Sequence, residues 1–188
     1  METFSHVRVV IGMILSLGLA TLLRGAAKLI QHPGRQRAYW VHLLWGFYIF
    51  LTLIHFWWWE HRLMDVSRWT FLKYFFVICF VLTYFGLAAL LFPDDIKDYN
   101  GFEDYFYSRK KWFFGGLALT FVLDIVDTLL KGSAHLQSLG PEYPIKSVVH
   151  VALCLVAMAS SSKRFHGILV LLLILYQFSY IMRMFNVI

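Results

Sequence analysis

A stripe of polar residues interrupts one long apolar stretch of this chain, and it is the strongest sign of chemistry in the sequence. A helix, which turns about 100° per residue, would place on one face the residues Thr120, Asp124, Asp127, Thr128 and Lys131. An ionisable group in hydrocarbon costs at least about 2.5–3.5 kcal/mol. The stripe is therefore expected to face protein or water rather than lipid.

Two interpretations of this stripe differ in function. In the first it lines a proton or small-cation pathway, in which Asp124 binds the proton or ion, Asp127 tunes it and Arg24 supplies a counter-charge. Lys131 continues the stripe, and His150 on the next predicted helix would act as a relay. In the second interpretation the stripe is structural, because Asp127 can pair with Lys131 four residues later and Asp124 can pair with a cation from another helix. We expect a channel or transporter and keep the structural alternative open.

Histidines suggest a second class of function. Paired imidazoles could hold two b-type haems, one toward each face of a membrane, on the residues His42, His55, His150 and His166. The chain would then be an electron-transfer protein. The spacing is unfavourable, because the turn of a helix places His42 and His55 about 140° apart. The leading expectation is a protein without a cofactor, and haem b is the alternative.

The elements that must position these residues follow from the composition. Of 188 residues, 60% are hydrophobic and only 15% are charged, whereas a soluble domain carries about 25% charged residues. Apolar stretches of the length that crosses about 30 Å of hydrocarbon run over Val7–Leu23, Tyr39–Trp59, Trp69–Phe92, Trp112–Leu130, Ser147–Ser160 and Phe165–Phe185. We therefore expect an all-α integral membrane protein with six transmembrane helices.

A repeated block suggests how these helices are arranged. Residues Thr21–Leu29 read TLLRGAAKL, and Thr128–Leu136 read TLLKGSAHL. A repeat that recurs after three spans predicts two inverted three-helix units. The expected organisation is a first repeat over residues 1–92, an amphipathic surface connection over 93–111 and a second repeat over 112–188.

The connection Pro93–Lys111 carries the third functional alternative. Tyr99, Phe102 and Phe106 would share one face of a helix, among acidic residues first and basic residues last. We expect a short amphipathic helix on the membrane surface. Such a helix could dock a partner, which would make the chain a non-catalytic membrane subunit or sensor.

Signatures of catalysis and of nucleic-acid binding are missing from the sequence. It contains no HExxH, GxSxG, CxxC, Walker or dinucleotide-binding pattern. The net charge of +6 follows from basic loops beside the spans rather than from a nucleic-acid-binding face. Enzymatic activity stays open, but the sequence favours a protein that is not an enzyme, and no metal site is assigned.

The distribution of basic residues predicts an orientation. Ten lie on one side of the predicted spans, namely Arg24, Lys28, Arg35, Arg37, Lys97, Arg109, Lys110, Lys111, Lys163 and Arg164, and the other seven of the 17 lie opposite. The positive-inside rule then places the side with ten in the cytoplasm and both termini outside. We expect a multi-pass protein of the cell (inner) membrane. A pathway through so small a bundle favours a homo-oligomer.

Overall fold

The computed structural model describes residues 2–32, 34, 37–66 and 68–185. Helices and the connections between them make up these residues, which contain no strand. The α-helices are α1 (Glu2–Gln31), α2 (Trp40–Trp59), α3 (Phe71–Leu91), α4 (Phe102–Leu130), α5 (Ser133–Ser138), α6 (Glu142–Ala159) and α7 (Lys163–Phe185). A 3₁₀ helix, η1 (Glu60–Asp65), continues directly from α2.

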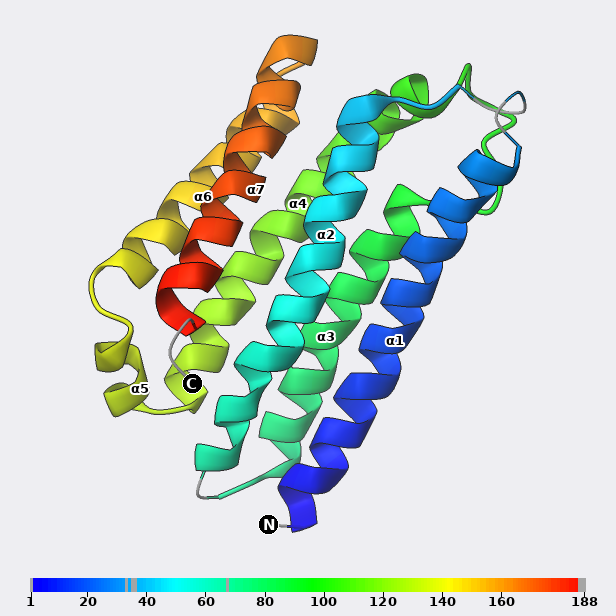
Figure 1. The fold of residues 1–188 in the computed structure, drawn as a ribbon. Coiled ribbons are helices and arrows are strands. Elements are labelled where there is room, and N and C mark those ends of the chain that lie inside the picture. Colours follow the sequence, from blue (N-terminus) through cyan, green and yellow to red (C-terminus); the bar gives the residue numbers. More distant parts are fainter. Residues whose placement is uncertain (1, 33, 35–36, 67, 186–188) are drawn as a thin grey trace.

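All of these α-helices except α5 are long and apolar enough to cross a membrane, which gives six candidate spans in the described residues. Successive spans run in opposite directions, and both termini lie at the lower end in Figure 1. The connections α1–α2, α3–α4 and α6–α7 lie at the upper end, whereas η1 and α5 lie at the lower end. The expected all-helical chain with six helices of membrane-spanning length is confirmed.

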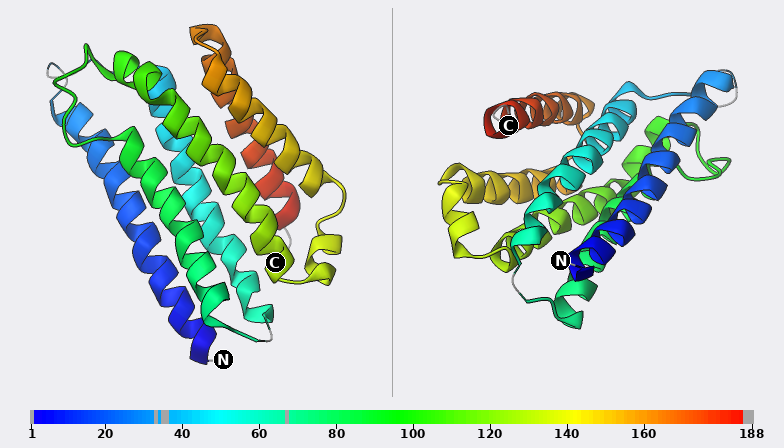
Figure 2. Two further views of the ribbon diagram at one scale, coloured as in Figure 1. Left: turned by 180° about the vertical axis from the view of Figure 1, so that it is seen from behind. Right: turned by 60° about the horizontal axis from the view of Figure 1, so that its bottom comes forward.

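The helices form a layered bundle with α1 at one edge and the α6–α7 hairpin at the other (Figure 2). The closest pairs are α1 with α3 and α4 with α6, while α2 contacts α1, α3, α4 and α7. Buried aromatic rings fill the centre, among them Trp45, Tyr48, Phe80 and Phe114. Large apolar side chains also cover the outside, where they suit hydrocarbon rather than water.

Polar contacts between helices hold the upper end of this bundle together. The last carbonyls of a helix have no partner within it. In α3 the Leu91 oxygen lies 2.7 Å from His42 Nε2, and the Leu90 oxygen accepts a bond of 2.6 Å from the Tyr105 hydroxyl. Because lipid gives helices no hydrophobic drive to associate, such bonds and close packing must supply the attraction. They fix α2 and α4 against the end of α3.

Two glycines allow close approaches at the same end. A Cβ on Gly25 in α1 would come within 2.1 Å of the Phe92 ring, so this ring packs directly on the α1 backbone. Gly101 has φ +131°, a conformation that side chains other than hydrogen rarely adopt. It lets the chain turn into α4 with the Phe102 amide donating to the Arg37 oxygen at 3.0 Å. The α1–α2 connection is thereby tied to the start of α4.

The helix α7 is attached to the bundle in a different way. It packs against α2 rather than along α6. At the lower end, the Arg183 guanidinium donates two bonds of 2.6 Å to the Glu142 carboxylate at the start of α6. The Tyr176 hydroxyl adds a bond of 2.9 Å to the same carboxylate. Long polar side chains therefore connect the last two spans.

The connection between α3 and α4 differs from the expected surface helix. Only residues 92–101 are non-helical, and Phe102–Lys111 form the first turns of α4. Phe102 and Phe106 are each 3% exposed, because their shared face packs into the bundle instead of resting on lipid. Phe102 and Phe106 do share one face of a helix, but this helix is the beginning of α4 and not a separate helix on the surface.

The two copies of the repeated block have different backbone conformations. Thr21–Leu29 lies within α1, whereas Thr128–Leu136 passes through the end of α4, a turn at Gly132 and the start of α5. The helices α1 and α4 do run in opposite directions (Figure 1), as an inverted repeat requires. Their partners differ, however, since α1 packs along α3 and α4 packs along α6. Pro33, in the turn after the first block, lies outside the described residues.

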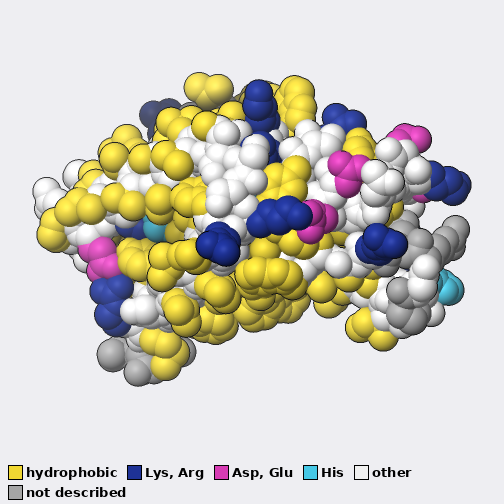
Figure 3. Space-filling model, turned by 90° about the horizontal axis from the view of Figure 1, so that it is seen from above, with side chains coloured by type: hydrophobic (Ala, Val, Ile, Leu, Met, Phe, Trp, Pro, Cys, Tyr) yellow, Lys and Arg dark blue, Asp and Glu magenta, His cyan; other side chains and the backbone are white. Residues whose placement is uncertain are grey.

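Basic side chains spread over the upper end of the molecule. Figure 3 views this end and shows Lys and Arg side chains across it, with Asp and Glu side chains among them. Lys163 pairs here with Glu103, and Lys97 pairs with Asp95 at 2.8 Å. Lys97 lowers the pKa of Asp95 through a hydrogen bond and its charge. Arg35, one of the ten basic residues assigned to this side, lies outside the described residues.

Candidate functional site

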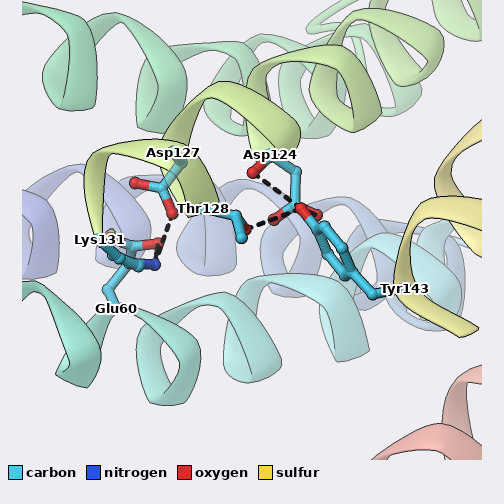
Figure 4. A network of polar contacts seen from close by, with 6 residues as sticks. All are labelled: Glu60, Asp124, Asp127, Thr128, Lys131 and Tyr143. Atoms are coloured by element: carbon cyan, nitrogen blue, oxygen red, sulfur yellow. Dashed lines mark hydrogen bonds and ion pairs between the residues drawn. The ribbon is translucent and has the colours of Figure 1, made fainter. Parts of the chain in front are cut away.

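A buried ionic cluster ties α4 to the end of α2. The Lys131 ammonium lies 2.5 Å from Asp127 Oδ2 and 3.1 Å from Glu60 Oε1 (Figure 4). The side chains of Lys131 and Asp127 are 0% exposed, and that of Glu60 is 4% exposed. The spacing of four residues predicts the pair on α4. Glu60 has no such signal, because its position beside three tryptophans indicates only the membrane interface.

Lys131 lies just beyond the apolar part of α4, and its charge is fixed by its neighbours. Burial alone lowers the pKa of this ammonium, but the carboxylates of Glu60 and Asp127 more than reverse that effect and raise it overall. The cation also lies 5.4 Å from the centre of the Trp59 ring. Lys131 is therefore held in its charged form, and with Asp127 it forms the structural pair that the second interpretation described.

Asp124, one turn earlier on α4, has a different environment. The Tyr143 hydroxyl on α6 lies 2.9 Å from both Asp124 Oδ2 and the Asp124 backbone oxygen, so it can donate to either. The Thr128 hydroxyl lies 2.8 Å from the same phenol (Figure 4). Among the described residues, the ion pairs of Lys131 and Arg183 go to Glu60, Asp127 and Glu142, and not to Asp124. Asp124 is therefore hydrogen-bonded but carries no direct ion pair.

Asp124 also lines a small cavity of about 40 Å³ between the helices. The polar side chains that line it come from five helices and include Thr52, His55, Tyr84, Asp124, Lys146 and Gln177. A buried water needs roughly 10–15 Å³ measured in this way and two to four polar partners. The cavity can therefore hold about two or three water molecules beside the carboxylate.

The cation of this cavity is Lys146 on α6. Its ammonium lies 4.1 Å from the centre of the Tyr180 ring and 5.2 Å from that of Tyr143. Cation–π contacts of this kind hold a charge without neutralising it. Opposite it, His55 Nδ1 lies 2.9 Å from Gln177 Nε2. Nothing in the local sequence around Lys146 indicates that this residue lies at the same cavity as Asp124.

Above this cavity the core is formed by apolar and aromatic side chains. Toward the upper end, Trp45 contacts the rings of Phe113 and Phe114 at centroid distances of 5.3 and 5.1 Å. Leu117, three residues after Phe114 on α4, is also buried. In this conformation the polar region therefore reaches into the bundle from the lower end and stops at a layer of aromatic and aliphatic side chains.

Arg24 does not join the polar region. It lines a separate cavity of about 260 Å³ at the upper end, with Lys28, Phe92 and Asp94. It therefore lies toward the end of α1, whereas Asp124 lies in the lower half of α4 (Figure 1). The expected counter-charge is thus not beside Asp124, and Lys146 occupies that place. The repeated block matches Arg24 to Lys131 in the sequence, but this match does not predict where the two side chains lie in the bundle.

The histidines do not form haem pockets. His42 stacks on Phe102 at 4.7 Å, and His166 stacks on Phe114 at 5.4 Å. At the lower end His150 Nδ1 donates a bond of 2.7 Å to the Lys146 backbone oxygen of its own helix, and His150 does not line the Asp124 cavity.

Rings also fill the space between the lower pair of histidines. Tyr180 contacts His55 at 6.2 Å, Tyr176 contacts His150 at 5.4 Å, and the two tyrosines stack on each other at 6.1 Å. A porphyrin needs an open slot between two imidazoles. These residues therefore do not fit a haem, and among the described residues no group of three His, Cys, Asp or Glu side chains could hold a metal ion.

No protein family, curated protein or solved structure matches the chain.

Proposed function

We propose that the chain is a multi-pass membrane protein that moves a proton or a small cation, with Asp124 as the binding carboxylate. The observation that supports this most directly is the cavity at Asp124. A carboxylate within a membrane-spanning helix adjoins a space large enough for water and accepts a hydrogen bond, yet has no cation in direct contact. Intramembrane acids in such positions mark ion pathways and proton relays.

The contrast with Asp127 supports a division of roles between the two acids. Asp127 is bound to Lys131 and completely buried, so it stabilises the bundle and shapes the field around Asp124. Asp124 would take a proton from cavity water on its carboxylate oxygen. Tyr143 orients that carboxylate, and Lys146 supplies the distant positive charge that favours its ionised form.

The aromatic layer above the cavity suggests from which side of the membrane the ion would enter. The cavity lies in the half of the bundle that carries the termini, and the basic distribution places this half outside the inner membrane. A proton or ion bound at Asp124 would then come from the outer side. Release to the cytoplasm requires the layer around Trp45 and Phe114 to part, either within one chain or at an interface between two copies in a homo-oligomer.

Flux measurements in liposomes test this proposal. Purified protein is reconstituted with an internal dye that reports H⁺, Na⁺ or K⁺, and a gradient of the reported ion is imposed in each case. We expect flux of one of these ions in the native protein and only background flux for Asp124→Asn. Asp65→Asn is the matched control, because its exposed carboxylate lies at the same end and pairs only with Arg62 at 3.6 Å. Equal flux in native and Asp124→Asn protein would refute the role of Asp124.

A further inference from the structure

The ionic cluster at the lower end carries more acid than base. Two buried carboxyl groups, Glu60 and Asp127, share the single ammonium of Lys131, so the cluster holds one more acidic group than basic groups. Glu60 Oε2 and Asp127 Oδ1 are both buried without a hydrogen-bond partner in the described residues. An uncompensated buried charge is costly. A further cationic group with N–H donors would balance the cluster.

A pocket beside Glu60 could admit such a group. It has a volume of about 350 Å³ and lies between α1 and the end of α2. Its walls are apolar and aromatic, formed by Phe4, Ile11, Trp57 and Trp58, and its polar groups are Arg8, Glu60 and His61. Aromatic walls with a carboxylate are the surroundings that bind organic ammonium groups. The pocket therefore offers a negative group to a cation and a positive group, Arg8, to an anion.

The two charges lie in a definite order along the bundle. The Arg8 guanidinium lies 5.5 Å from the centre of the Trp57 ring. Trp57 precedes Glu60 by three residues, which is about 4.5 Å along a helix. The basic group is thus deeper in the apolar part, and the carboxylate is nearer the end of the bundle. In a zwitterionic phospholipid the phosphate likewise lies nearer the acyl chains, and the ammonium lies further out.

We propose that this pocket binds the headgroup of a phospholipid whose phosphate contacts Arg8 and whose primary ammonium contacts Glu60, as in a phosphatidylethanolamine. A primary ammonium can donate hydrogen bonds to the carboxylate of Glu60, which lines the pocket, whereas a quaternary ammonium has no N–H to donate. The acyl chains continue along the apolar surface of α1, where Val9 and Met13 are exposed. Trp57 and Trp58 are partly exposed at the rim, as expected for residues at the interface between headgroups and hydrocarbon.

Native mass spectrometry with defined lipids tests the proposal. Protein stripped of lipid in detergent is titrated with phosphatidylethanolamine, phosphatidylcholine and phosphatidylglycerol of identical acyl chains. We expect phosphatidylethanolamine to bind about tenfold more tightly than the other two, which is the ratio that about 1.4 kcal/mol provides. Equal binding of phosphatidylethanolamine and phosphatidylcholine, or tighter binding of phosphatidylglycerol, would overturn the proposal.

Two variants separate the contacts. Glu60→Gln leaves Lys131 paired with Asp127, and we expect it to abolish the preference for phosphatidylethanolamine over phosphatidylcholine. Arg8→Gln is expected to weaken both lipids equally, because both carry the phosphate. Glu103→Gln, at the upper end, is the control and should change neither affinity. A Glu60→Gln protein that folds and keeps the preference would overturn the assignment of the ammonium to Glu60.

A final measurement identifies the source of the headgroup. Free phosphoethanolamine is added to the complex with phosphatidylethanolamine. No displacement at millimolar concentration supports a lipid as the ligand, since the acyl chains contribute to binding. Displacement at low concentration would show that the pocket takes a soluble phosphoamine, and the lipid assignment would fall. Because the pocket does not include Asp124, this result is independent of the flux measurements.

Discussion

The Tyr143 hydroxyl lies 2.9 Å from Asp124 Oδ2 and so connects α6 to the acid that lines the cavity on α4. One turn further along α4, Asp127 is connected instead to Lys131 and through it to Glu60. Neighbouring acids on one helix thus have different partners, a phenol for one and an ammonium for the other. The predictions below separate the contributions of these contacts.

Removal of the phenol should destabilise the α4–α6 contact. Tyr143→Phe leaves Asp124 Oδ2 and the Thr128 hydroxyl without this partner in a buried place. A buried polar group that loses its partner costs about 1–3 kcal/mol, so the unfolding temperature in detergent should fall. Tyr99→Phe is the matched control, because its hydroxyl accepts from Arg109 at an exposed site. Equal unfolding temperatures for the two variants would contradict the importance of the buried contact.

Removal of the cluster's only cation should destabilise the protein more strongly. Lys131→Met leaves Glu60 and Asp127 as buried acids without a counter-charge, and breaking a buried pair in this way costs about 3–5 kcal/mol. The triple variant Lys131→Met, Asp127→Asn, Glu60→Gln removes all three charges and should recover most of the loss. Lys163→Met breaks an exposed pair with Glu103 and should cost about 1 kcal/mol or less. Denaturant unfolding of the four proteins measures these differences.

The same cation predicts a loss of stability at alkaline pH. The folded protein raises the pKa of Lys131 above the ordinary value of 10.5. Its contribution to stability is therefore complete below pH 10.5 and decreases as the pH rises through the higher value of the folded state. Above pH 10.5 the unfolding temperature should therefore fall more in the native protein than in the triple variant. Parallel curves for the two proteins would contradict the assignment.

A glycine pair tests the packing at the upper end. Gly25→Ala places a Cβ within 2.1 Å of the Phe92 ring, close to its attachment, so the ring must move. Overpacking of this kind costs about 1–3 kcal/mol. Gly86→Ala in α3 meets nothing within 4 Å and should be neutral or stabilise the helix by about 0.5–1 kcal/mol. Unfolding temperatures that change in opposite directions would agree with this prediction.

The sequence was sufficient for features that depend on neighbouring residues. Apolar stretches predicted the six long helices, because length and hydropathy alone decide which segments suit a membrane. The pairing of Asp127 with Lys131 was also accessible, since four residues bring two side chains together on a helix. Gly101, whose positive φ turns the chain into α4, follows Asn100, and an Asn-Gly pair is a local signal for a turn.

Contacts between residues that are far apart in the sequence could not be predicted from it. Glu60 is 71 residues from Lys131, and Tyr143 is 19 residues from Asp124. Only the packing of α2 and α6 against α4 brings these side chains together. The choice of Arg24 as counter-charge failed for the same reason: a helical repeat gives the spacing along one helix but not the rotation of one helix against another.

The bond between Glu142 and Arg183 has a consequence for movement. The other helix pairs are held by closely packed surfaces, whereas this bidentate contact at the rim, with Tyr176, fastens the end of α7. Rim ion pairs exchange with water and salt at little cost. Salt can therefore weaken the contact between α7 and α6, while α7, which carries Gln177 at the cavity, stays packed against α2.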